Sequence, residues 1–277
     1  MIRVALRFDD PSATSHRGVE QGVIAALEES GAQATFAAIP FRNTPAGRLA
    51  LDASNCAHLL AACRSGVVEV ALHGHSHLRL SSDGQPSEFS GLAGERQAAL
   101  LTEAAGHLRG LFGEGSISGF VPPWNSYDAA TLTALEGLGF DYVSAGWQHP
   151  PSYAGRLAIL PRTCQFTELE STIAEARRYA RFAPHVVAVF HHYDFLESGE
   201  DGSTLDLPGF ARRLAWLKRQ SDVQVMGLAD MVAAGRSGVL ARVFSGRLRK
   251  EQLPWRLRQR LPSHCLVDAP IWRLIFA

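Results

Sequence analysis

Short apolar runs alternate with amphipathic segments along most of this chain. Apolar runs of strand length predict buried strands over residues 2–8, 33–39, 67–72, 118–121, 141–144, 157–160, 185–190 and 223–228. Apolar positions at helical spacing predict helices over residues 16–30, 55–65, 92–112, 127–138, 169–182 and 210–220. Because strands that alternate with helices build parallel sheets, we expect an α/β fold, an irregular (β/α) barrel with seven or eight strands.

Turn and cap residues mark the ends of several of these segments. Gly31 follows the first predicted helix, where a left-handed C-cap favours glycine. Asn125 or Ser126 is the expected N-cap of the helix over residues 127–138. Residues 78–90 are polar and rich in Gly, Ser and Pro, which predicts a loop.

Composition limits the function classes. The chain has 277 residues and 46% hydrophobic content, enough for one large domain with a substantial core. Its net charge is zero and it carries no nucleic-acid-binding motif, so we expect no nucleic-acid partner. Four cysteines without a CxxC pair, no secretory leader and no apolar run near about 18 residues favour a cytoplasmic protein.

The charge changes near residue 235. Residues 236–277 hold nine Lys/Arg and two Asp/Glu. We therefore expect a barrel over residues 1–235 and a basic C-terminal extension over residues 236–277. Its arginines, with Trp255 and Trp272, fit peripheral contact with an anionic membrane or a lipid-linked substrate. The alternative is an extension that packs its leucines and exposes its arginines to solvent.

Two polar clusters follow apolar runs and form a candidate metal site. Asp9 and Asp10 end the first run, and a histidine-rich segment from His73 to His77 follows a later one. The carboxyl ends of barrel strands meet on one face, so these groups can converge. Asp10, His73 and His77 make a ligand set for one divalent ion, Zn²⁺ first, with Co²⁺, Ni²⁺ or Mn²⁺ as alternatives. Asp9 is then a base beside it. His75 should point away if the segment is extended.

Three more clusters follow later strands, at residues 119–125, 161–162 and 191–194. With these motifs in order, residues 1 to about 230 resemble the polysaccharide deacetylases, the family 4 carbohydrate esterases, which share a chitooligosaccharide-deacetylase homology domain. The resembling motifs are Phe8-Asp9-Asp10, His73-x-x-x-His77, Pro122-Pro123-Trp124 and Val189-Phe190-His191.

The resemblance implies a role for each motif. Asp9 would be the catalytic base, and Asp10, His73 and His77 the metal ligands. The Trp124 backbone amide would help hold the oxyanion, and His191 would be the catalytic acid. His192 is an alternative acid, and Asp194 could orient either imidazole. Trp124, Asn125 and His192 are the expected substrate contacts.

The sequence departs from the family pattern in its third motif. Val121 stands where the family usually has the Arg that orients the catalytic Asp. Arg162 and Arg7 are the candidate substitutes. We favour Arg162, because Arg7 should face away from Phe8 in an extended strand. The first motif also reads Asp-Asp-Pro, where the family usually has Asp-Asp-Gly, and no Asp-Trp motif is evident.

The expected function is metal-dependent hydrolysis of the N-acetyl group of an amino sugar in a glycan or a lipid-linked glycan precursor. One alternative is a catalytically inactive carbohydrate-binding protein of the same fold. Another is a metal-dependent phosphoesterase using His73 and His75, but that chemistry usually needs further acidic ligands, which the sequence does not offer.

Overall fold

The computed structural model describes residues 1–81, 84–147, 150, 153, 155–234 and 264–267. Most of residues 236–277, to which we assigned a membrane-contacting surface, therefore lies outside the described residues. Of this stretch, Leu266 is buried and pairs in antiparallel fashion with His185, with backbone hydrogen bonds of 2.8 Å in both directions. Residues 264–267 thus pack against the barrel. The domain boundary at 235 stays a prediction.

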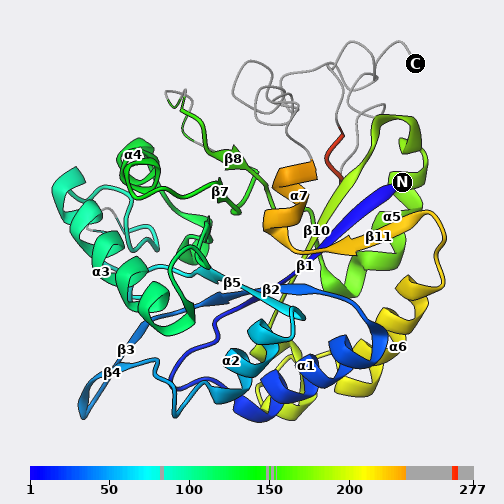
Figure 1. The fold of residues 1–277 in the computed structure, drawn as a ribbon, viewed down its shortest axis with the longest axis horizontal. Coiled ribbons are helices and arrows are strands. Elements are labelled where there is room, and N and C mark those ends of the chain that lie inside the picture. The colour runs from blue at the N-terminus through cyan, green and yellow to red at the C-terminus, as the bar shows by residue number, and fades with distance from the viewer. Residues whose placement is uncertain (82–83, 148–149, 151–152, 154, 235–263, 268–277) are drawn as a thin grey trace.

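Within the described ranges, a parallel sheet of nine strands forms the centre of the fold (Figure 1). The strands follow the order β8-β7-β6-β5-β2-β1-β10-β9, and β11 pairs with the first half of β1. Their bounds are β1 (Ile2–Asp9), β2 (Ala34–Ala38), β5 (Val68–Leu72), β6 (Gly119–Phe120), β7 (Tyr142–Val143), β8 (Ala158–Ile159), β9 (Cys164–Gln165), β10 (His185–His191) and β11 (Val223–Met226).

The sheet curls because the segment that joins its two edge strands, β8 and β9, bonds to β7 and to β10. The Leu160 N–H, just after β8, donates to Val143 O of β7 at 2.9 Å. Three residues on, the Thr163 N–H donates to Val187 O of β10, also at 2.9 Å. The result is a distorted (β/α) barrel, which confirms the predicted fold class.

Helices cover the outside of the sheet (Figure 1). They are α1 (Arg17–Ser30), α2 (Ala57–Arg64), α3 (Gly94–Phe112), α4 (Ala129–Gly137), α5 (Leu169–Arg177), α6 (Leu207–Lys218) and α7 (Leu228–Ala234). Gly31 closes α1 in the left-handed conformation, as expected. Asp128, whose carboxylate accepts the Thr131 N–H, caps α4, so the expected Asn125 or Ser126 cap is wrong. Within the described residues, no helix combines the length and the apolar character needed to cross a membrane.

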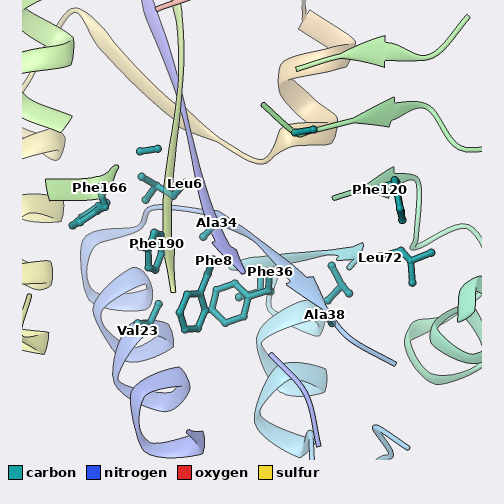
Figure 2. Close-up of a cluster of buried hydrophobic side chains, with 14 of the residues drawn as sticks. Leu6, Phe8, Val23, Ala34, Phe36, Ala38, Leu72, Phe120, Phe166 and Phe190 are labelled. Atoms are coloured by element: carbon teal, nitrogen blue, oxygen red, sulfur yellow. The ribbon is translucent and has the colours of Figure 1, made fainter. Parts of the chain in front are cut away.

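The two faces of β1 serve different purposes. Leu6 and Phe8 join the large core between sheet and helices, where Phe8 lies 4.9 Å from both the Phe36 and Phe190 rings (Figure 2). Arg7 and Asp9 alternate with them and point into the barrel. Side chains inside the barrel are small near the carboxyl ends, as at Ala37 and Ala71. This leaves room there for polar groups.

A short hairpin was not expected from the sequence. It consists of β3 (Phe41–Thr44) and β4 (Gly47–Ala50), paired antiparallel. Most of its residues are at least partly exposed, so it carries no apolar periodicity. The Phe41 N–H donates to His75 O at 3.2 Å, which ties the hairpin to the histidine segment.

Candidate metal and catalytic centre

The proposed ligands Asp10, His73 and His77, here called the metal triad, converge at the carboxyl ends of β1 and β5. Asp10 Oδ1 lies 3.1 Å from His73 Nε2 and 3.5 Å from His77 Nε2. Such separations suit two ligands that share one ion at about 2 Å from each. Asp10 Oδ1 is buried and accepts no hydrogen bond from the described residues, which is costly unless a cation completes the site. In the described part of the chain, this is the one acid–histidine cluster with ligand geometry.

Asp10 and His77 favour the forms that bind a cation, whereas the pKa of His73, which burial lowers, is raised overall by the Asp10 carboxylate. His73 Nδ1 lies 2.8 Å from Val121 O, so Nδ1 carries the proton and Nε2 is left to bind. Burial opposes ionisation of Asp10, but the neighbouring imidazoles, His73 above all, hold the pKa of Asp10 well below its ordinary value. Burial and the nearby His73 lower the pKa of His77, which favours the neutral form that a ligand needs.

Asp9 is held by Arg7. The Arg7 guanidinium donates to both Asp9 oxygens, from Nε at 2.9 Å and from its terminal nitrogen at 2.7 Å. Its other nitrogen donates to the carbonyl and hydroxyl oxygens of Ser144 across the barrel, each at 3.0 Å. The pair is almost fully buried. The expectation that Arg162 orients Asp9 is therefore wrong.

The alternation of β1 explains this outcome. Residues two apart in a strand share a face, so Arg7 and Asp9 point to the same side. Arg7 does face away from Phe8, which points to the helices, and for that reason it shares the face of Asp9. Arg162 lies just beyond β8, where its backbone N–H donates to Ala145 O at 2.7 Å and its side chain is partly exposed.

His191, at the end of β10, lies on the same face as Asp9. Its Nε2 is 3.8 Å from Asp9 Oδ2. Asp194 Oδ2 accepts the His191 backbone N–H at 2.7 Å and lies 3.5 Å from Nδ1, so it holds the start of the turn that carries the ring. The exposed Tyr193 ring stacks on the imidazole, with centroids 4.5 Å apart.

His192 lies on the other side of the strand. Its Nε2 is 2.8 Å from Glu20 Oε1, and its ring packs on Phe8 with centroids 4.6 Å apart. The predictions of His192 as alternative acid and as substrate contact are therefore wrong, because adjacent residues of an extended chain face opposite sides.

A buried carboxylate shapes the histidine segment. Glu88 accepts the backbone N–H groups of His75 at 2.9 Å and Ser76 at 2.7 Å. Gly74 has φ 70°, and a Cβ there would lie 2.1 Å from Glu88 Oε2. The His75 ring leaves the site and meets Glu103 Oε2 at 2.9 Å, as expected for a residue that is not a ligand. Glu88 had no signal in the sequence, since it sits in a polar loop.

The Pro123–Asn125 turn borders the triad. The Trp124 ring packs on His77, with centroids 4.3 Å apart. Asn125 Oδ1 is buried without a hydrogen-bond partner. Five non-glycine residues among those described have positive φ, and four of them lie in this centre: Asp10, His77, Trp124 and Asn125. Backbone strain concentrated in this way is common at functional sites.

Comparison with known proteins decides the family. The sequence model of the polysaccharide deacetylases matches residues 2–143, about half of the chain. The chain belongs to the polysaccharide deacetylase family. This result confirms the resemblance inferred from the motifs. No curated protein sequence matches the chain.

Solved structures of this family share the fold of this chain at low sequence identity. A putative polysaccharide deacetylase from Mycobacterium smegmatis is 14% identical with a TM-score of 0.56, over 84% of this chain and 89% of that one. A family 4 acetyl xylan esterase from Clostridium thermocellum, solved with cobalt, is 14% identical with a TM-score of 0.52, over 84% and 91%. A CE4 family pseudoenzyme from Bacillus anthracis is 11% identical with a TM-score of 0.50, over 83% and 64%.

Proposed function

We propose that this polysaccharide deacetylase hydrolyses the N-acetyl group of an amino sugar in a glycan or glycan precursor. The observation that carries the proposal is the joint placement of a buried, arginine-bound Asp9 and of His191 beside the metal triad. A base and an acid beside a metal site are the groups that amide hydrolysis needs.

Asp9 is the proposed base. Its contact with Arg7 fixes the direction of the carboxylate, so that an oxygen lone pair remains available for the proton of an attacking water. Asp10, His73 and His77 would hold the divalent ion, which supplies Lewis acidity toward the water and the acyl oxygen. We propose Zn²⁺, with Co²⁺, Ni²⁺ or Mn²⁺ as alternatives that the same nitrogen and oxygen donors accept.

His191 is the proposed acid. It would give its proton to the sugar nitrogen as the C–N bond breaks, because an unprotonated amine is a poor leaving group. Asp194 positions it from the far side. The Trp124 backbone N–H is the proposed donor to the developing oxyanion. Trp124 and Asn125 remain the proposed substrate contacts, supported by the unpartnered Asn125 Oδ1.

The contact between Arg7 and Asp9 weakens the case for a catalytically inactive carbohydrate-binding protein. The missing arginine of the third motif was the reason to consider a carbohydrate-binding protein without activity. Arg7 makes a two-point contact to Asp9 from the first strand, so the contact attributed to that arginine is present. Pseudoenzymes occur among proteins of this fold, so an activity measurement must separate the two.

The test is acetate release by metal-loaded protein from N-acetylated chitooligosaccharides and from acetylated xylan. We expect release from the N-acetylated substrate, abolished by a chelator and restored by Zn²⁺. Asp9→Asn should lower kcat by roughly 10²–10⁴-fold, the size of a lost general base, while metal content is kept. Asp141→Asn, at the opposite end of the barrel, is the matched control. Sugar binding without acetate release from any acetylated substrate would favour the inactive alternative.

Membrane contact through residues 236–277, and with it a cytoplasmic and membrane-associated location, stays a prediction from the sequence. We expect the full chain to sediment with anionic vesicles at low salt and to be released at high salt. Absence of sedimentation at both salt concentrations would contradict it.

A further inference from the structure

Three arginines near the metal and catalytic centre have no acidic partner in the part of the chain that the structure describes. Arg42, Arg79 and Arg162, here called the rim arginines, come from β3, from the loop after the histidine segment and from the end of β8. None of them forms an ion pair within the described part of the chain, whereas Arg48, Arg156 and Arg177 do. Their charges are therefore open to a ligand.

Two rim arginines lie on the Trp124 side of the centre. The Arg79 guanidinium carbon is 5.7 Å from the centre of the Trp124 ring, which itself packs on His77. Arg42 follows Phe41 on β3, and the Phe41 N–H donates to His75 O of the histidine segment at 3.2 Å. Arg48, on the facing strand of the same hairpin, bonds to Glu103 at 2.6 Å and covers Phe41. The hairpin thus pairs Arg48 with an acid and leaves the half-buried Arg42 without an ion pair among the described residues.

The third rim arginine lies on the His191 side. Arg162 lies beyond β8, at the carboxyl end of the sheet, where its N–H donates to Ala145 O. Its charge opposes the rise that burial causes in the pKa of Tyr193. The Tyr193 ring is 50% exposed and stacks on His191. An exposed aromatic face beside a catalytic residue can receive a sugar ring. Arg162 is then placed to meet a substituent of that sugar or of its neighbour.

The acids of the centre are already engaged. Asp9 is bound by Arg7, Asp10 belongs to the triad, Asp194 accepts from the His191 backbone, and Glu88 accepts from backbone N–H groups. None is left to neutralise the rim arginines. A guanidinium recognises planar or tetrahedral oxyanions through paired N–H groups, so carboxylates and phosphates are its preferred ligands.

We propose that the substrate is an anionic saccharide, which carries carboxylate or phosphate groups on or next to the acetylated sugar. The rim arginines bind these groups from both sides of the centre while a sugar ring stacks on Tyr193. This inference rests on the proposed deacetylase function and narrows its substrate class.

The experiment uses three probes with the full metal-loaded chain: an N-acetylheparosan oligosaccharide for carboxylate, UDP-N-acetylglucosamine for phosphate, and a neutral chitooligosaccharide. Acetate release gives kcat and KM at low and high NaCl. Calorimetric binding to Asp9→Asn gives an affinity that does not depend on turnover. We expect at least one acidic probe to bind and react better than the neutral one, with a preference that salt weakens.

The double variant Arg79→Gln/Arg162→Gln should raise KM and Kd for the acidic probe by roughly tenfold, the sum of two exposed charge contacts, with little change for the neutral probe. Arg64→Gln, on the exposed last turn of α2, is the matched control and should change neither. Equal or better use of the neutral probe at both salts would overturn the anionic substrate and leave the deacetylase intact. Tight, arginine-dependent binding of an acidic probe without acetate release would instead overturn the deacetylase and leave the anion site intact.

Discussion

Two clusters of histidine and carboxylate lie on opposite faces of the sheet, near the carboxyl end of β1. One is the metal triad inside the barrel. The other, here called the Glu20 cluster, joins Ser15, Glu20, His58 and His192 under the helices. Its carboxylate bonds to both imidazoles and to the Ser15 hydroxyl. Two adjacent residues lie on the two sides: His191 faces Asp9 beside the triad, and His192 belongs to the Glu20 cluster.

The clusters differ in what remains unsatisfied. Both oxygens of Glu20 have partners, and Glu20 is buried, while the His192 ring packs on Phe8. The triad leaves Asp10 Oδ1 buried without a hydrogen bond, and its three ligand atoms lie within 4.8 Å of one another. Proximity of histidines to a carboxylate therefore does not define a metal site. The triad is marked as a metal site by a buried ligand oxygen without a hydrogen bond from the described residues, because an ion would offset the cost of burying it.

The largest effect expected from this comparison is on metal binding. Asp10→Asn should remove the ion and reduce acetate release to background, because the amide is a poor ligand for Zn²⁺. Glu20→Gln should keep the metal. Metal content after dialysis, measured by elemental analysis, checks both. An Asp10→Asn protein with full occupancy would show that the ion binds elsewhere.

Among the stability effects, the largest is expected from replacing Arg7, the buried arginine that holds Asp9. Arg7→Met leaves Asp9 and the Ser144 oxygens buried without their donor, and should cost about 3–5 kcal/mol in urea unfolding. Arg156→Met, which breaks an exposed pair with Glu136, should cost no more than about 1 kcal/mol.

Arg7→Lys keeps the charge but not the two-point geometry, and should lower kcat more than it raises KM. Arg7→Lys also tests the contact between Arg7 and Asp9 if the Arg7→Met protein does not fold. Wild-type kcat in Arg7→Lys would show that the orientation of Asp9 does not depend on the guanidinium.

The Glu20 cluster should control stability at acidic pH. Burial opposes ionisation of Glu20, but its bonds to His192 and His58 lower its pKa from 4.5 to about 2. The stabilisation is present above pH 4.5, the unfolded value, and is lost as pH falls toward about 2. Unfolding free energies measured across this range should fall less steeply for Glu20→Gln than for the wild type. Parallel curves would contradict this assignment.

The smallest effect is expected at His75. It stands between the two histidine ligands in sequence but bonds to Glu103 outside the centre. His75→Asn should keep metal content and change stability by about 0.5–1.5 kcal/mol, the range of one hydrogen bond. His73→Asn, tested in parallel, should lose the metal. Equal metal loss in both would mean that the order of the segment, rather than its ligands, decides binding.

Local patterns predicted much of this molecule. The strands, the helices and the barrel followed from apolar periodicity, since burial on a strand or a helix face acts over a few residues. Asp10, His73 and His77 were found because they directly follow strands whose carboxyl ends converge. The hairpin at residues 41–50 was not predicted, because most of its side chains are exposed or half-exposed and show no apolar periodicity.

The sequence by itself determined the parallel α/β architecture and the residues that a metal could use. Only the tertiary structure decided which cation holds Asp9, which of two adjacent histidines faces it, and which carboxylate shapes the histidine segment. Arg7 reaches Ser144, 137 positions away, and Glu20 reaches His192, 172 positions away. Such partners depend on how strands close into a barrel and on the space inside it, and those properties belong to the packed chain rather than to any short stretch of it.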